Sequence, residues 1–372
     1  MKIYNSSDNI REVESNCNYI KQNNNRNFGI DLLRIIMMFL IVLRHGSYQS
    51  GAISIANIPK MNYLIGIVIA NISGIAVNCY IIISGYFLCK QKIRFERIFN
   101  LYITIIFYSL NIALIALILP NFHISKKILF HAIFPLCTGF SWFMSYYIVL
   151  SIISPFINKT LSILTKEQFF FLLGILLFFF SLIPSFGLST FSQVGGYTFI
   201  WFVVLYCTGA YLRFHGKESS IYKNLIGYIS FCLLTFVCLL LRFILKKRGI
   251  ILVHPDNYDF LPTFLTSVFC FKIFLNMKLP ACVHGLIARI SPLMLGCYLF
   301  HDHDLKHELW GKLLVIQKHI NDNLWLWHML ACVCAVFILG CIFEYIRQLL
   351  CRKILCSLKN KKLSKWISDL NL

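Results

Sequence analysis

The chain has 372 residues, of which 58% are hydrophobic and 13% charged, and its mean hydropathy is +0.71. A soluble fold cannot bury that much apolar surface, so the composition predicts an all-α, polytopic membrane protein embedded in a lipid bilayer. The formal net charge of +20 does not indicate a nucleic-acid partner, because the basic residues cluster at the ends of apolar segments, where lipid headgroups are the expected counter-charge. The fifteen cysteines are scattered through apolar segments, which favours small core residues over a disulfide framework.

The first segment, residues 1–26, is rich in Asn and Ser, so we expect a disordered cytoplasmic tail and not a signal peptide. The predicted transmembrane domain covers 27–350, and a basic cytoplasmic tail covers 351–372. The apolar runs of the transmembrane domain lack the alternation of apolar and polar residues that is typical of barrel strands, so we expect the spanning elements to be helices. We predict ten spans, at about 28–47, 62–88, 98–119, 142–158, 168–184, 197–213, 222–245, 259–277, 285–301 and 324–347.

The distribution of lysine and arginine between these spans predicts the orientation of the chain. With the N-terminus in the cytoplasm, 22 basic residues lie on the cytoplasmic side or at the cytoplasmic ends of spans, 9 lie on the opposite side and 4 lie deeper within spans. Both termini are therefore expected in the cytoplasm. The basic segment 246–248 falls on the opposite side, so either this loop tolerates the violation or one span is miscounted, with 128–140 dipping into the membrane.

The first span carries Asp31, Arg34, Arg44 and His45. Ionisable groups at bilayer depth are costly and mark functional sites. Arg34 and His45 are eleven residues apart, which at about 100° per residue gives three turns plus roughly 20°, so they share one face about 16 Å apart. A cation and a base placed in this way can act on two parts of one long ligand. We expect Arg34 to pair with Asp31, whereas Arg44 points elsewhere and can simply reach lipid headgroups.

Four further motifs follow along the chain: YIIISGYFL at 80–88, RFER at 94–97, SWFMSYYIVL at 141–150 and YLFH at 298–301. Within the first of these motifs, Ser84 and Gly85 favour close helix approach. Together with the Arg and His of the first span, the four motifs occur in the order found in the membrane acyltransferase-3 family. Over residues 28 to about 304, the chain resembles the bacterial O-acetyltransferases of cell-surface glycans.

This resemblance implies an O-acyltransferase of the bacterial cytoplasmic (inner) membrane, with acetyl-CoA as the acyl donor and no metal. Arg34 and His45 are the implied catalytic residues. A neutral imidazole can take the proton from an attacking sugar hydroxyl, or it can form an acyl-histidine, and the sequence leaves both routes open.

The remaining implied site residues bind the two substrates. Arg94 and Arg97, spaced i, i+3, would share a face and hold the phosphates of the acyl-CoA. The acceptor is a cell-surface polysaccharide or its lipid-linked precursor. Trp142, Tyr298 and His301 are expected to bind or support it.

Each of these residues also has a plainer interpretation. His45 can be an interfacial histidine bonded to a loop carbonyl, Arg94 and Arg97 can anchor a cytoplasmic loop, and Trp142 can belong to an aromatic belt. The cluster HDHDLKH at 301–307 invites a metal site. No second cluster has zinc-type spacing, and histidines separated by one residue point to different helix faces, so we predict no metal there.

Two other functions compete with the acyltransferase. A transporter or flippase of polysaccharide or lipid-linked sugar would also carry charged residues inside its spans, although no inverted repeat is visible in the sequence. A glycan polymerase is multi-span and aromatic-rich as well, but the ordered motifs fit it less closely.

Overall fold

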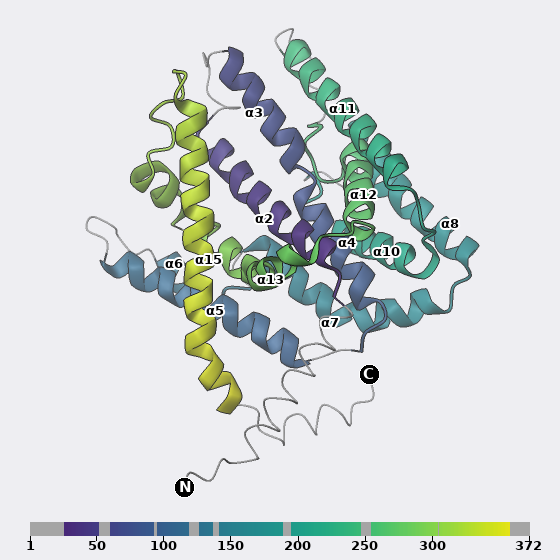
Figure 1. The fold of residues 1–372 in the computed structure, drawn as a ribbon, viewed down its shortest axis with the longest axis horizontal. Helices are drawn as coiled ribbons and strands as arrows, with labels where there is room; N and C mark the ends of the chain where they lie inside the picture. The colour runs from purple at the N-terminus through teal and green to yellow at the C-terminus, as the bar shows by residue number, and fades with distance from the viewer. Residues whose placement is uncertain are drawn as a thin grey trace.

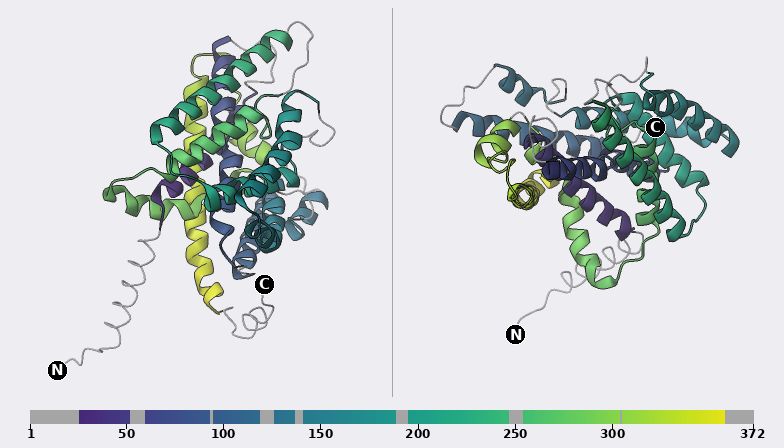
Figure 2. Two further views of the ribbon diagram at one scale, coloured as in Figure 1. Left: turned by 90° about the vertical axis from the view of Figure 1, so that its right-hand side faces the viewer. Right: turned by 90° about the horizontal axis from the view of Figure 1, so that it is seen from above.

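The computed structural model describes residues 26–51, 60–92, 95–118, 126–136, 141–188, 195–246, 254–303 and 305–357. This part of the chain is helical and contains no strand. Figures 1 and 2 show the helices gathered into one bundle, with the long C-terminal helix along one side. The longer helices are α2 (Phe28–Gln49), α3 (Lys60–Ser73), α4 (Ala76–Leu88), α5 (Phe95–Ile118), α7 (Trp142–Ser162), α8 (Lys166–Leu177), α10 (Phe199–His215), α11 (Ile221–Lys246), α12 (Leu261–Leu275), α13 (Ala281–Ile290) and α15 (Trp325–Ser357).

Three of the predicted spans are built from more than one helical element. The second span consists of α3 and α4 with a break at Gly74–Ile75, and the fifth and ninth spans are likewise composite. The predicted dip at 128–140 coincides in part with a short helix, although 137–140 lie outside the described residues. The shorter elements are α6 (Lys126–Ile133), η1 (Phe178–Leu182), α9 (Ile183–Ser185), η2 (Ser291–Leu293), α14 (Met294–His301) and η3 (Glu308–Leu313).

Six helical segments of the described chain are long and apolar enough to cross a membrane. This finding confirms a helical protein with several candidate spans, while the ten-span count and the cytoplasmic termini stay predictions. The helices α10 and α12 are apolar but shorter. The six segments are Met61–Leu88, Glu96–Ile118, Lys166–Ser185, Ile221–Leu245, Ala281–His301 and Trp325–Cys351.

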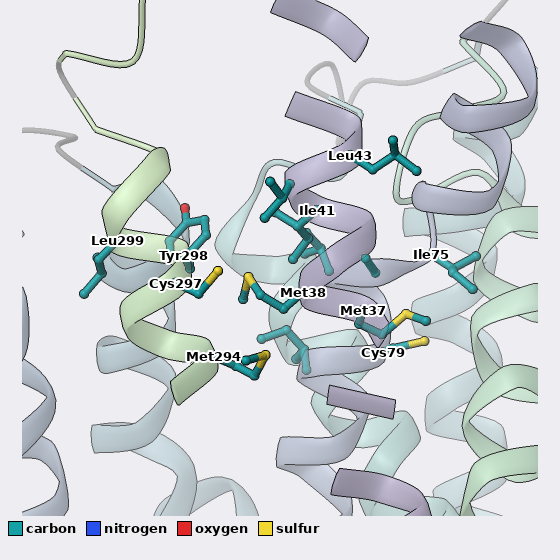
Figure 3. Close-up of a cluster of buried hydrophobic side chains, with 14 of the residues drawn as sticks. Met37, Met38, Ile41, Leu43, Ile75, Cys79, Met294, Cys297, Tyr298 and Leu299 are labelled. Atoms are coloured by element: carbon teal, nitrogen blue, oxygen red, sulfur yellow. The ribbon is translucent and has the colours of Figure 1, made fainter. Parts of the chain in front are cut away.

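Helix α2 lies at the centre of the bundle and contacts α3, α4, α12, α13, α14 and α15 (Figure 1). Its first turn is capped by Asn27, whose side chain accepts a hydrogen bond of 2.9 Å from the Ile30 amide. Figure 3 shows Met38 and Ile41 of α2 directed towards Tyr298 on α14, and Cys79 on the opposite side of α2. Because apolar neighbours surround α2, its polar residues are held at fixed positions inside the bundle.

Close helix crossings at glycine position the elements around α2. A Cβ on Gly85 of α4 would overlap the carbonyl oxygen of Tyr206 on α10, and one on Gly209 of α10 would overlap the carbonyl oxygen of Ile82. The two backbones are therefore in direct contact, as the small residues of this motif predicted. On α14, a side chain at Gly296 would overlap Glu344 of α15.

The predicted topology can be tested with single cysteines at two exposed positions. We expect Gln91→Cys, beside the RFER motif, to react with a membrane-impermeant thiol reagent only from the cytoplasmic side, and Asn323→Cys only from the other side. Ser50 is unsuitable for labelling because its side chain is buried. Among the described cysteines, Cys282 and Cys334 are exposed, so both variants are made in a parent in which all fifteen native cysteines are replaced. Labelling of both new cysteines from one side of sealed vesicles would overturn the orientation.

Candidate active site

A cavity of about 380 Å³ runs along one side of α2. This volume is within the range of small-molecule sites, about 300–1,000 Å³. Its wall includes five of the predicted site residues, from motifs that are far apart in the sequence: Arg34, His45, Arg97, Trp142 and Tyr298. Arg94 lies outside the described residues. The cavity therefore joins the arginine end and the histidine end of α2, as their shared helix face predicts.

One end of the cavity is formed around Asp31, which is buried. Arg34 donates to its Oδ1 at 2.7 Å, Ser291 donates to the same oxygen at 3.1 Å, and Arg26 pairs with Oδ2. The Arg34–Asp31 pair predicted from the i, i+3 spacing is thus present. About a third of the Arg34 side chain stays exposed, so its guanidinium remains accessible from the cavity.

Arg97 faces the same end of the cavity from the first turns of α5. Three arginines, Arg26, Arg34 and Arg97, and one carboxylate, Asp31, therefore line this end in the described chain. Three cations and one anion leave a net positive charge of about two, which favours an anionic ligand group such as a phosphate.

The other end holds His45, whose imidazole lines the cavity. Its ring centroid lies 5.1 Å from that of His301, and the two planes are tilted by 54°. His301 is completely buried and is not part of the cavity wall. It is placed behind His45, where it can support the ring of His45 but is not positioned to touch an acceptor.

The tautomer of His301 follows from its surroundings. Its Nδ1 lies 2.7 Å from the carbonyl oxygen of Cys297, and because a carbonyl only accepts, Nδ1 carries the hydrogen. Within the part of the chain that the structure describes, its Nε2 is buried without a hydrogen-bond partner. A neutral ring therefore lies next to His45, and it adds no positive charge that would oppose protonation of His45.

Asp302 anchors a polar network beside His45. The Tyr298 hydroxyl donates to its Oδ2 at 2.9 Å, Lys306 pairs with Oδ1 at 3.0 Å, and Ser141 donates to Tyr298 at 3.1 Å. Burial alone would raise the pKa of Asp302, but its interactions with the His45 imidazole and the Lys306 ammonium outweigh burial and hold that pKa below its usual range. Asp302 is thus an anion at neutral pH. It stabilises the protonated form of the neighbouring imidazole.

Arg44 corrects one sequence interpretation. The sequence allowed it to extend to lipid headgroups, but its side chain is only 9% exposed and pairs with Asp256 Oδ2 at 3.2 Å. It also donates to the Ala70 carbonyl at 3.0 Å, and its guanidinium lies over the Tyr48 ring. The headgroup interpretation is wrong because α2 lies inside the bundle, where a charged side chain requires a buried partner.

Sequence reasoning missed three loop residues at the His45 end of the cavity, namely Asp256, Tyr258 and Tyr197. Asp256 is 212 residues from Arg44, and no periodic pattern relates the two positions. Tyr197 and Tyr258 also line the cavity, although they lie on loops outside the motifs. The one local signal was the polar, proline-containing segment HPDNYD at 254–259, which interrupts two apolar runs.

The Arg44–Asp256 pair should make stability depend on pH. Burial alone would raise the pKa of Asp256, but hydrogen bonding to His254 and the charge of Arg44 outweigh burial and lower it well below its usual range. Because the pKa of Asp256 is lowered in the folded protein, the pair stabilises the fold at pH values above about 3.9, the pKa of an aspartate in the unfolded chain. This stabilisation is lost as the pH falls from there towards the lower pKa of the folded state. We expect Asp256→Asn to cost about 2 kcal/mol at pH 7 and progressively less below pH 4.

Thermal unfolding of the detergent-solubilised protein between pH 7 and pH 3 measures this difference. Glu167→Gln, at an exposed position on α8, is the matched control and should follow the wild type throughout. A stability gap between wild type and Asp256→Asn that stays constant over the whole range would contradict the linkage.

The cluster at 301–307 does not form a metal centre in the described residues. No three His, Cys, Asp or Glu side chains among them are arranged to hold an ion, and Asp304 lies outside the described chain. Asp302 is instead committed to Tyr298 and Lys306. The prediction of a metal-free site stays a prediction.

A helical bundle with several candidate spans, an internal cavity, a cationic end and a histidine beside a carboxylate define a membrane protein with an internal ligand site. A family model described as an acyltransferase domain matches residues 27–345. The chain belongs to this acyltransferase-3 family and is a membrane acyltransferase, as its ordered motifs indicated. Comparisons with curated proteins and with solved structures gave no match.

Proposed function

We propose that this acyltransferase moves an acetyl or similar short acyl group from cytoplasmic acetyl-CoA to a hydroxyl of a cell-surface polysaccharide or its lipid-linked precursor, in the bacterial inner membrane. The observation that carries the proposal is the single cavity that joins Arg34 and Arg97 to His45. A long donor with phosphates at one end and a thioester at the other matches this arrangement.

The charges assign the two ends of the donor. Arg34 and Arg97, with Arg26, supply the guanidinium groups that hold phosphates through charge-assisted hydrogen bonds. The thioester would then reach His45, about three helical turns away along α2. Apolar residues between them, including Met38 and Ile41, line the cavity where an uncharged chain would lie.

The chemistry at His45 is an acyl transfer. The acceptor hydroxyl oxygen forms a bond to the thioester carbonyl carbon while His45 takes the hydroxyl proton. The carbon–sulfur bond then breaks, and the proton returns to the thiolate of the departing CoA. In the alternative route, the His45 nitrogen first displaces the thiolate, and the acyl-histidine then passes its acyl group to the hydroxyl. Asp302 stabilises the positive charge that His45 gains in either route.

The test measures CoA release and transfer of labelled acetyl groups by the purified full-length protein, with candidate glycans as acceptors. Over many turnovers, the proposal expects both products to appear in equal amounts and to depend on the acceptor. A transporter or flippase would release no CoA. Absence of both products with every acyl-CoA and glycan tried would overturn the proposed reaction.

A further inference from the structure

Two loops that lie far apart in the sequence contribute to the cavity wall at the His45 end. Residues 195–198 precede α10, and residues 254–260 precede α12. The Tyr258 amide donates to the Gly195 carbonyl at 3.1 Å. Gly195 and Gly196 have φ values of +62° and +84°, and a Cβ at either position would collide with Asn257 or Tyr258. Glycine is therefore required where the loops meet.

Three aromatic rings meet at this junction, and all of them line the cavity. The centroid of Tyr197 lies 4.7 Å from that of Trp142 and 4.8 Å from that of Tyr258. Tyr197 remains 39% exposed, whereas Tyr258 is buried and its hydroxyl lies 3.4 Å from the Tyr197 hydroxyl. The result is an aromatic surface with one exposed ring, Tyr197, held by the two rings beside it.

The aromatic surface is attached to the site by Arg44. This guanidinium binds both the carboxylate and the carbonyl oxygen of Asp256, two residues before Tyr258. From α4, Asn78 donates to the Tyr258 carbonyl at 2.8 Å. Since Arg44 directly precedes His45 on α2, the same helical turn fixes both the imidazole and the aromatic surface. The aromatic rings and His45 line the same cavity.

The charges at this end differ from those at the arginine end. Arg44 is balanced by Asp256, and Asp302 is balanced by Lys306. Among the described residues around His45, two cations therefore face two anions. Such a site gives no electrostatic preference for an anionic group, and burying an unpaired anion there would be costly.

We propose that Tyr197, with Trp142 and Tyr258 behind it, is the acceptor subsite, and that it takes an uncharged sugar ring. This inference rests on the proposed function and narrows its acceptor to glycans with a neutral residue at the acylated position. The C–H face of a pyranose lies against the aromatic ring, where dispersion and the negative face of the π-system favour it. The ring hydroxyls then face the cavity and His45.

Binding of methyl glycosides tests the subsite without any acyl transfer. We use saturation-transfer NMR on the full-length protein in nanodiscs, with the methyl α-glycosides of glucose, galactose, mannose and rhamnose, and with methyl α-glucuronide as the anionic counterpart. At least one neutral glycoside should bind about tenfold more tightly than the glucuronide. Its ring C–H protons should show the strongest saturation.

Variants of Tyr197 locate the binding on the protein. Tyr197→Ala should weaken the neutral glycoside about tenfold, whereas Tyr197→Phe, which keeps the aromatic face, should retain most of the affinity. Tyr222→Ala, at a highly exposed tyrosine on α11, is the matched control and should bind like the wild type. Equal binding by wild type and Tyr197→Ala, tighter binding of the glucuronide, or no binding of any neutral glycoside would each overturn the inference.

Enzymatic turnover separates this inference from the proposed function. If acetyl transfer occurs and Tyr197→Ala raises the acceptor KM while the acetyl-CoA KM is unchanged, both are supported. If acetyl transfer occurs but the acceptor KM is unchanged in Tyr197→Ala, only the subsite fails. If neutral glycosides bind through Tyr197 and no CoA is released, only the proposed reaction fails.

Discussion

Replacing His45 with alanine should reduce acyl transfer by about 10²- to 10⁴-fold, the range typical for removal of a positioned general acid–base group. The imidazole lines the cavity beside His301 and the Asp302 network. The variant removes the group that accepts the hydroxyl proton, or the nucleophile itself, while α2 keeps its buried apolar contacts. Expression and membrane insertion should therefore remain normal.

The measurement is the rate of labelled acetyl transfer at equal amounts of inserted protein. His215→Ala, at the end of α10 and outside the cavity wall, is the matched histidine control and should retain wild-type activity. Near-normal transfer by His45→Ala would remove His45 from the chemistry. A covalent acyl-protein trapped in the wild type and absent from His45→Ala would support the acyl-histidine route, whereas its persistence in the variant would leave only the general-base role.

The second large effect is expected at the arginine end of the cavity, where we propose that the acyl donor binds. The double variant Arg34→Ala/Arg97→Ala should raise the acetyl-CoA KM by about two orders of magnitude, because each well-formed charge-assisted contact is worth roughly 1.5–3 kcal/mol. The value of kcat should change little, since these contacts are the same in the ground state and the transition state. Asp31 would still be paired with Arg26 and Ser291, so its charge would not be left without a partner.

Lysine replacements distinguish phosphate binding from the alternative in which Arg97 only anchors a cytoplasmic loop. Arg34→Lys/Arg97→Lys should recover only part of the donor affinity, because lysine keeps the charge and lacks the bidentate fork. Arg289→Ala, at an exposed position on α13, is the matched control and should leave the donor KM unchanged. An unchanged donor KM in the double alanine variant would exclude these arginines from the site. Full rescue by lysine together with low abundance of the alanine variant would assign Arg97 to loop anchoring.

Local features of the chain were sufficient for the fold class. The length of the apolar runs predicted helices at bilayer scale, and the 3.6-residue period placed Arg34 and His45 on one face, where the cavity lies. The i, i+3 spacing also predicted the Arg34–Asp31 pair. These predictions succeeded because they depend on geometry within a single helix.

Contacts between distant segments were decided only by the tertiary structure. The partner of Arg44 is Asp256, 212 residues away on an irregular loop, so no helical period could relate them. Tyr197 reaches the cavity because two loops pack together through Gly195 and Gly196. His301 lies behind His45 because α14 packs against α2 and places it in the interior. Sequence alone determined the helical class and which face of α2 lines the cavity, whereas the packing of helices and loops determined which buried charges are paired and which aromatic rings face the cavity.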